Sequence, residues 1–213
     1  MERQVEALRA RVDRRWSYTA FLQVDASGNP LPEEAERPWV PHEGDIFEQV
    51  VTGRAQIRTP TVLATRQLLS EAGRFDETLL SAEDYDLWLR LALHSEVAIV
   101  NEPLVYVRRH EESHTRDWQS AFVGRDRLLS RHQQLVDSAR GSLLREERVN
   151  NALKLAATHA QLGARGRVLR ALWDSLPYSW TYPRWWLSGL RTVLRPYVPR
   201  RLLEFYRARR RGT

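Results

Sequence analysis

The sequence predicts a helix-rich α/β chain in which a mixed α/β domain, residues 1–115, is followed by an all-helical extension, residues 116–213. In the first part, segments rich in β-branched and aromatic residues, such as 16–24, alternate with helical patterns. After about Arg116 the apolar residues recur at helical spacing alone. We therefore place a domain boundary near that residue.

Composition places the chain among ordinary globular proteins. Of its 213 residues, 42% are hydrophobic and 28% are charged, which excludes wholesale disorder and a fibrous class. No apolar stretch reaches the ~18 residues that a membrane-spanning helix needs, and the N-terminus lacks the pattern of a signal peptide. The absence of cysteine excludes disulfides and thiolate metal sites. We expect a cytoplasmic location.

Periodicity and turn residues define the first elements of the α/β part. Apolar residues at helical spacing predict a helix over residues 1–12, and the segment 16–24 predicts a strand that ends in a turn at 25–30. Four prolines mark residues 30–43 as a surface loop. A short helix is expected after Gly44.

The remaining elements follow the same reasoning. Residues 57–63 predict an extended segment, and residues 66–72 a helix that Gly73 closes. Residues 82–94 form the strongest helical pattern, and 97–107 a strand or strand pair interrupted at Asn101-Glu102-Pro103. Helices are expected in the extension at 117–137, 142–162, 165–175, 184–195 and 199–210. The second and third of these predict a hairpin with alanines at its contact.

The helix at 82–94 carries acidic residues with two interpretations. Ser81-x-x-Asp84 fits a capping box, so the acids could serve only to start the helix. Alternatively, Asp84 shares a helix face with Leu87, Trp88 and Leu91, whereas Asp86 points nearly the opposite way. A carboxylate aligned with buried apolar residues points into an inner cavity, which suits a general base.

The residues around this helix resemble a known signature. Gly73-Arg74-Phe75-Asp76-Glu77 followed by Glu83-Asp84-Tyr85-Asp86-Leu87-Trp88 is similar to the acceptor-side signature of family 2 glycosyltransferases. Three further stretches are similar to that family in the same order, namely 5–8 with the turn at 25–29, 57–66, and 104–110. The last departs from the family in that Val107 stands between tyrosine and arginine. The resemblance covers roughly residues 1–115.

This resemblance implies the acceptor-side half of a GT-A-like domain. It implies an inverting transfer of a sugar from a nucleotide-sugar donor to a saccharide or lipid-linked acceptor, as in polysaccharide biosynthesis of the cell envelope. Asp84 would be the base and Glu83 would orient it. The residues expected to bind the acceptor are Thr61, Asp76, Glu77, Trp88 and Arg90. His110 would approach the divalent metal, Mg or Mn. A buried strand threonine at 61 and a strand-end histidine without a ligand role at 110 are the alternatives.

The nucleotide-binding half of that family has no counterpart in the sequence. The only Asp-x-Asp is Asp84-Tyr85-Asp86, which lies on the wrong element to hold the metal and the diphosphate. The chain is thus expected to be a truncated gene product, one part of a split enzyme, or a remnant domain. Without the metal and phosphate clamp, we expect it to transfer no sugar alone. The alternative function is non-catalytic binding of a glycan, a membrane or a partner chain.

The positive charge lies at the C-terminal end. From Arg184 onward there are nine arginines and a single acid, Glu204, in a chain whose net charge is +6. Tryptophans stand close by at 173, 180, 185 and 186. Basic helices with aromatic residues often lie on anionic membranes, so residues 178–213 are expected to contact the inner face of the cell membrane. A solvated basic tail is the alternative. No nucleic-acid partner is expected, because no recognised binding module accompanies the arginines.

Overall fold

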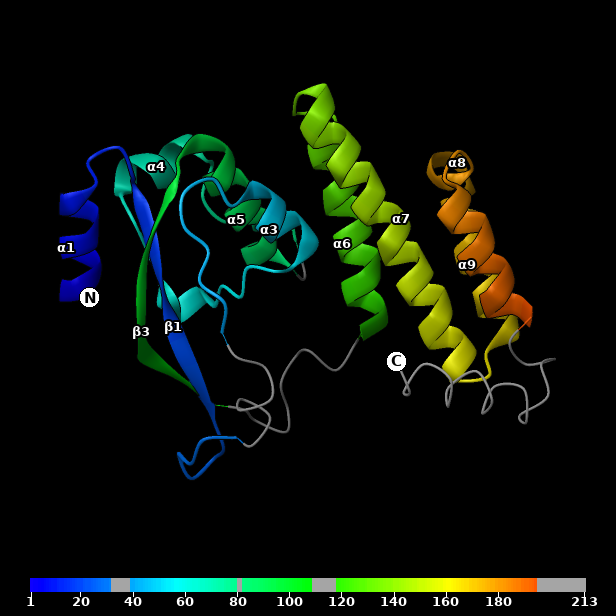
Figure 1. Ribbon diagram of the computed structural model, residues 1–213, viewed down its shortest axis with the longest axis horizontal. Helices are drawn as coiled ribbons and strands as arrows, with labels where there is room; N and C mark the ends of the chain where they lie inside the picture. Colours follow the sequence, from blue (N-terminus) through cyan, green and yellow to red (C-terminus); the bar gives the residue numbers. More distant parts are fainter. Residues whose placement is uncertain (32–38, 80–81, 109–117, 195–213) are drawn as a thin grey trace, which may run out of the picture. The chain divides into compact units, whose positions relative to one another are not determined.

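The structure, a computed structural model, describes residues 1–31, 39–79, 82–108 and 118–194 (Figure 1). It is helix-rich, with a small mixed α/β part followed by a helical extension. The chain divides into two compact units, Met1–Leu144 and Arg145–Thr213. This division differs from the expected boundary near residue 116, because the helix α6 (Trp118–Gln133) packs into the core of the first unit.

One three-stranded sheet organises the first unit. Its strands are β1 (Trp16–Val24), β2 (Val62–Ala64) and β3 (Val97–Arg108), in the order β2-β1-β3. The central strand β1 pairs antiparallel with β2 and parallel with β3. Because parallel neighbours need a crossover connection, the residues between β1 and β3 form helices that cover the sheet.

The interruption expected in the last strand is a bulge. Thr19 of β1 pairs with Val100, but the next two residues of β1 pair with Pro103 and Val105. The register therefore shifts twice within one continuous strand. Proline has no backbone N–H to donate to a sheet ladder, which explains why the irregularity centres on Pro103.

Helices lie on both sides of the sheet. In the first unit these are α1 (Glu2–Ala10), α3 (Phe47–Thr52), α4 (Arg66–Glu71), α5 (Glu83–His94) and α6, with a 3-10 turn η1 (Thr59–Thr61) before β2. Figure 1 shows α1 on one side of β1 and β3, and α3 and α5 on the other side. The helices predicted within the described part of this unit are present with bounds that differ by a few residues, but the segment predicted to be extended at 57–63 forms the 3-10 turn η1 before β2.

The core of the first unit lies between the sheet and α5. The Trp16 and Trp88 rings stack with their centroids 6.3 Å apart and an angle of 10° between their planes. The indole N–H of Trp16 donates to the Ser95 carbonyl at 3.0 Å. Leu129 of α6 and Leu144 complete this core. Large aromatic side chains contribute most to such burial, so the tryptophan stack fixes how α5 sits on the sheet.

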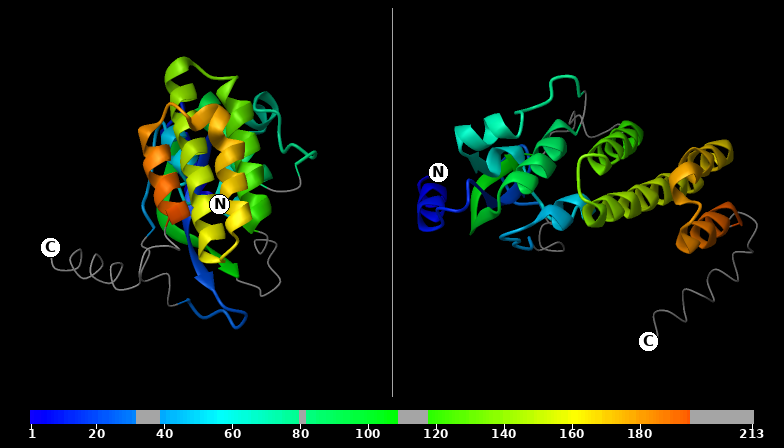
Figure 2. Two further views of the ribbon diagram at one scale, coloured as in Figure 1. Left: turned by 90° about the vertical axis from the view of Figure 1, so that its right-hand side faces the viewer. Right: turned by 90° about the horizontal axis from the view of Figure 1, so that it is seen from above.

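The second unit is a small helical assembly. It contains the later turns of α7 (Ser138–Gln161), followed by α8 (Arg165–Ser179) and α9 (Pro183–Leu194) (Figure 2). Ala156 of α7 packs with Val168 and Ala171 of α8 in one core, which confirms the predicted hairpin. The helix predicted at 199–210 lies outside the described residues. Among the helices that the structure describes, none combines the length and hydropathy needed to cross a membrane.

Candidate functional site

The start of α5 differs from its prediction. Its N-cap residue is Ala82, in the left-handed conformation with φ 60°, and no side chain caps the helix. The carboxylate of Asp84 accepts a hydrogen bond from the Tyr85 backbone N–H at 2.7 Å. The predicted capping box with Ser81 as N-cap is therefore wrong, and Ser81 itself lies outside the described residues. Alanine has no side-chain acceptor to offer at this position, and its left-handed conformation costs about 1 kcal/mol.

Of the two aspartates of α5, Asp86 is the more deeply buried, contrary to expectation. Asp86 is buried with 1% of its surface exposed, whereas Asp84 is half-buried and Glu83 is exposed. The prediction that Asp86 points away from the buried side is wrong, whereas Asp84 is partly buried on the helix face that it shares with buried Leu87, Trp88 and Leu91. The cause is that α5 is covered on two sides. One side carries Trp88 against the sheet, and the other carries Asp86 against α6.

Asp86 is the centre of a buried ionic cluster. One oxygen lies 2.9 Å from His132 Nε2, and the other accepts hydrogen bonds from Arg90 Nε, at 2.9 Å, and from Arg90 Nη2. His132 is as deeply buried as Asp86. Burial raises the pKa of Asp86, but the hydrogen bonds from His132 and Arg90 outweigh that effect, so its pKa is lowered.

Arg90 joins α5 to the end of α4. Besides binding Asp86, its Nη1 donates to the carbonyl of Ala72, the residue that ends α4. The next residue, Gly73, has φ +85°, and a Cβ there would lie 3.3 Å from Arg90 Nη1. A glycine thus allows the chain to turn closely past the guanidinium. Two nitrogen atoms of this guanidinium bind Asp86 within α5, and the third joins α5 to the end of α4.

The loop after α4 is held by α6. Asp76 accepts hydrogen bonds from the backbone N–H and the hydroxyl of Thr78, and from Arg131 Nη1 at 2.7 Å. These bonds hold the pKa of Asp76 far below its usual range. Glu77 beside it is exposed. Two adjacent residues of α6 therefore bind these aspartates: Arg131 binds Asp76, and His132 binds Asp86.

Sequence reasoning missed these two α6 residues. Arg131 and His132 stand at the end of a predicted helix and belong to no motif. Their partners lie 55 and 46 residues away in the sequence. A local pattern carries no signal for a contact over such a separation.

Two other predicted acceptor residues, Trp88 and Thr61, are buried. Trp88 is buried in the tryptophan stack, and its indole N–H has no hydrogen-bond partner among the described residues. Thr61 is buried in η1, where its hydroxyl donates to the Arg58 carbonyl at 2.7 Å. Both side chains serve the packing of the first unit. His110, the predicted metal contact, lies outside the described residues.

The Asp-x-Asp sequence at the start of α5 does not fit a divalent ion. Both oxygens of Asp86 are already bound by cationic or hydrogen-bonding side chains, and Asp84 lies on a different side of the helix. Within the described ranges, no group of three or more histidine, aspartate and glutamate side chains could hold a metal. The residues present therefore do not match the ion that the family resemblance implies.

What remains accessible at the start of α5 is a pair of acids. Within the part of the chain that the structure describes, neither Glu83 nor Asp84 forms an ion pair. Both lie in the first turn of the helix, where the helix dipole favours negative charge. An unpaired carboxylate at the edge of the fold is able to accept a proton from a bound hydroxyl.

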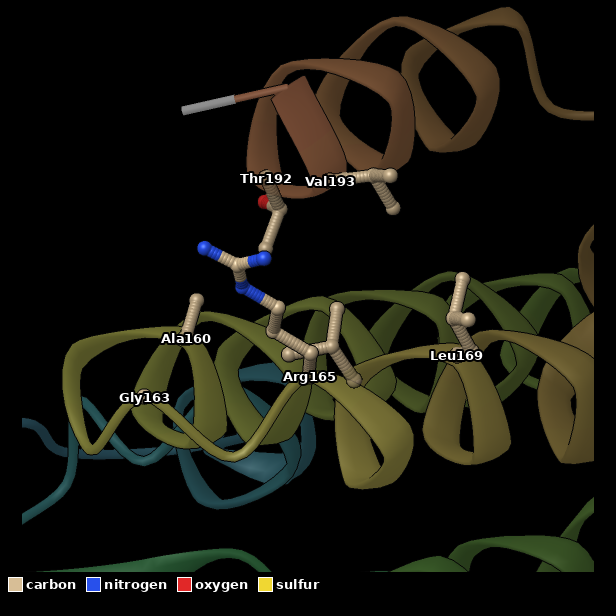
Figure 3. A pocket seen from close by; sticks show the side chains of 7 residues that line it. Ala160, Gly163, Arg165, Leu169, Thr192 and Val193 are labelled. Atoms are coloured by element: carbon tan, nitrogen blue, oxygen red, sulfur yellow. The ribbon is translucent and has the colours of Figure 1, made fainter. Parts of the chain in front are cut away.

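A separate cavity lies in the second unit. Its volume is about 250 Å³, and Figure 3 shows Arg165 extending from the start of α8 toward Thr192 of α9. Ala160, Leu169 and Val193 supply apolar walls. The cavity combines an apolar lining with one guanidinium and one hydroxyl.

The deeper burial of Asp86 predicts that its substitution destabilises the chain more than the same substitution at Asp84. Asp86→Asn should lower the free energy of unfolding by about 3 kcal/mol, because it leaves buried Arg90 and His132 without their carboxylate. The matched variant Asp84→Asn should change it by less than about 0.5 kcal/mol, because that side chain is half-exposed. Urea denaturation followed by circular dichroism measures both. Equal effects of the two substitutions would contradict the assignment.

The same carboxylate predicts an acid dependence. Because the pKa of Asp86 is lower in the folded chain than the unfolded value of about 3.9, its stabilisation is complete above that pH and is lost below it. The difference in unfolding free energy between the wild-type chain and Asp86→Asn should therefore shrink as the pH falls from 5 through about 4. Denaturation at a series of pH values tests this, and Asp76 titrates equally in both chains. A difference that stays constant with pH would refute it.

Comparisons with known proteins assign the chain to no family. A scan against models of protein families finds no match, and a search of curated proteins finds no similar protein. The resemblance to family 2 glycosyltransferases thus depends on the residue patterns of the chain itself.

Proposed function

We propose that residues 1–144 form the acceptor-binding side of an inverting, family 2-like glycosyltransferase. The donor would be a nucleotide sugar and the acceptor a saccharide or a lipid-linked saccharide. Asp84 would act as the base, with Glu83 beside it. This proposal begins from the sequence motif and adds the contacts that join its two halves.

One observation carries the proposal: the loop 73–79 and the helix α5 are fastened to each other. Arg90 of α5 binds the carbonyl of Ala72 at the start of the loop. From α6, Arg131 binds Asp76 in the loop while His132 binds Asp86 of α5. The two halves of the motif are therefore held in one place, with the unpaired acids of α5 at its accessible edge. This is the arrangement that a composite acceptor site requires.

The proposed chemistry at this site is a proton transfer coupled to substitution. The acceptor hydroxyl loses its proton to the Asp84 carboxylate while its oxygen forms a bond to the anomeric carbon of the sugar. The bond from that carbon to the nucleoside diphosphate breaks on the opposite side, which inverts the configuration. For this step Asp84 must lie within hydrogen-bond reach of the hydroxyl.

The described residues offer no clamp for the departing diphosphate. Stabilising that charge is usually a leading catalytic contribution, and the donor is therefore expected to be held by other residues than these. The misfit of Asp84 and Asp86 to a metal also favours a second candidate, a domain that binds a glycan without transferring sugar. Both candidates use the same acceptor site.

As part of the proposal, we place the chain in the cytoplasm, peripheral to the inner face of the membrane.

The first test concerns turnover. The purified 213-residue chain, incubated with uridine, guanosine and thymidine diphosphate sugars and Mg²⁺ or Mn²⁺, should release no nucleotide above the buffer background. Chromatography of the nucleotides measures this. Metal-dependent release that Asp84→Asn abolishes would show instead that the chain is a complete enzyme.

The second test concerns acceptor binding. The labelled chain should bind a subset of saccharides on an array that includes lipid-linked oligosaccharides, and Asp84→Ala should weaken this binding about tenfold, because a hydrogen bond to a charged group is lost. Asp13→Ala, which removes an exposed aspartate elsewhere, is the matched control. Circular dichroism checks that each variant is folded. Absence of saccharide binding by the wild-type chain, or equal binding by Asp84→Ala, would defeat both candidate functions.

A further inference from the structure

The hairpin of α8 and α9 exposes a set of large apolar side chains. Their exposed fractions run from 54% to 72%, and they are Leu169, Trp173, Trp180, Trp186, Leu187 and Leu190. Exposed apolar residues scattered singly need no explanation, but a contiguous group of this kind marks a surface that binds something. We call these six residues the hairpin surface.

The residues of the hairpin surface are contiguous across the two helices. Leu169 and Trp173 of α8 and its C-cap residue Trp180, which keeps helical backbone angles, follow at i, i+4 and i+11, which places them on one stripe. The indole N–H of Trp186, on α9, donates to the carbonyl of Trp180 at 2.8 Å. Between the helices lies an open groove of about 560 Å³ whose lining includes Leu169, Trp173 and Trp186. The surface is therefore one hollowed apolar area.

This surface is separate from the residues that hold the hairpin together. Trp185 is buried and donates from its indole N–H to Ser175 Oγ at 2.9 Å. Gly189 packs against Leu172, where a Cβ would lie 3.3 Å from a leucine methyl. The inner contacts of α9 are thus satisfied without the exposed tryptophan and leucines. Internal packing of the hairpin does not explain why those residues are apolar.

Arginines border the apolar stripe of α9. Arg184, Leu187 and Arg191 follow at i, i+3 and i+7, so both guanidinium groups stand along one edge of the stripe. On helix α8, Arg170 lines the groove, and its Nε donates to the Asp174 carboxylate at 3.1 Å. An apolar stripe of tryptophan and leucine bordered by arginine is typical of a helix that lies in the interface of an anionic bilayer.

We propose that the hairpin surface binds the surface of an anionic lipid bilayer. The tryptophans lie at the level of the headgroups, Leu187 and Leu190 enter the boundary with the acyl chains, and the arginines contact lipid phosphates. At 12 residues, α9 is too short to span a bilayer, for which about 20 residues are needed, so it lies along the surface. This inference deepens the peripheral membrane location proposed above, on which it rests, and uses none of the residues of the proposed acceptor site.

Co-sedimentation of the full 213-residue chain with vesicles tests the proposal. The probe is phosphatidylcholine vesicles with about 30% phosphatidylglycerol, compared with phosphatidylcholine alone, at about 0.15 M salt. The chain should bind the anionic vesicles and not the neutral ones. Leu187→Ser with Leu190→Ser should weaken binding by at least about tenfold. Arg184→Gln with Arg191→Gln should weaken it about 25-fold, because each charge removed weakens binding about fivefold.

Matched controls come from the first unit. Leu135→Ser removes a leucine about as exposed as Leu187, and Arg9→Gln removes an exposed arginine of α1. Both should bind anionic vesicles like the wild-type chain. Circular dichroism verifies folding of every variant, and the exposed positions make unfolding by the hairpin substitutions unexpected.

Three outcomes would overturn the proposal. Unchanged vesicle binding by the leucine variant would assign the binding to residues outside the hairpin surface. A concentration-dependent dimer that the leucine variant disrupts, without binding to vesicles, would identify a second copy of the chain as the partner. Retention on DNA at the same salt, again without vesicle binding, would identify nucleic acid as the partner of the arginines.

Discussion

The buried carboxylate of Asp86 is the constraint on which the first unit depends. A charge taken out of water is tolerated only when partners compensate for the lost hydration. Here Arg90 and His132 provide that compensation from two different helices. Because Arg90 also binds the end of α4 and Arg131 also binds the loop 73–79, one buried charge sets the position of four segments. These contacts also fix the position of the accessible edge of α5, where Glu83 and Asp84 lie.

This cluster also explains why the structured unit extends past residue 116. Without α6, Asp86 would lose His132 and the loop would lose Arg131. Leu129 and Leu144 add apolar contacts to the same core. The helices after the sheet therefore belong to two different cores, and α6 is the first of them. The first completes the α/β part, and α8 and α9 belong to an assembly with its own core.

Much of the local structure was predictable from the sequence. The strand Trp16–Val24 has the predicted bounds because its β-branched and aromatic residues are followed at once by a turn, and Gly73 ends α4 where a left-handed residue was expected. The site was less predictable. Apolar periodicity shows which side of α5 meets the sheet, but a side buried through ionic contacts contains polar residues and looks exposed. This is why the burial of Asp86, which binds Arg90 and His132, could not be read from the sequence.

The parallel pairing of β1 with β3 has a consequence for how the chain folds during its synthesis. The register joins Trp16 to Val97, so the central strand leaves the ribosome about 80 residues before its parallel neighbour. At a synthesis rate of about 5 to 20 residues per second, that interval is roughly 4 to 16 s. Throughout it, the apolar side chains of β1 lack most of their final contacts. The nascent chain therefore exposes these apolar side chains until α5 and β3 emerge to cover the strand.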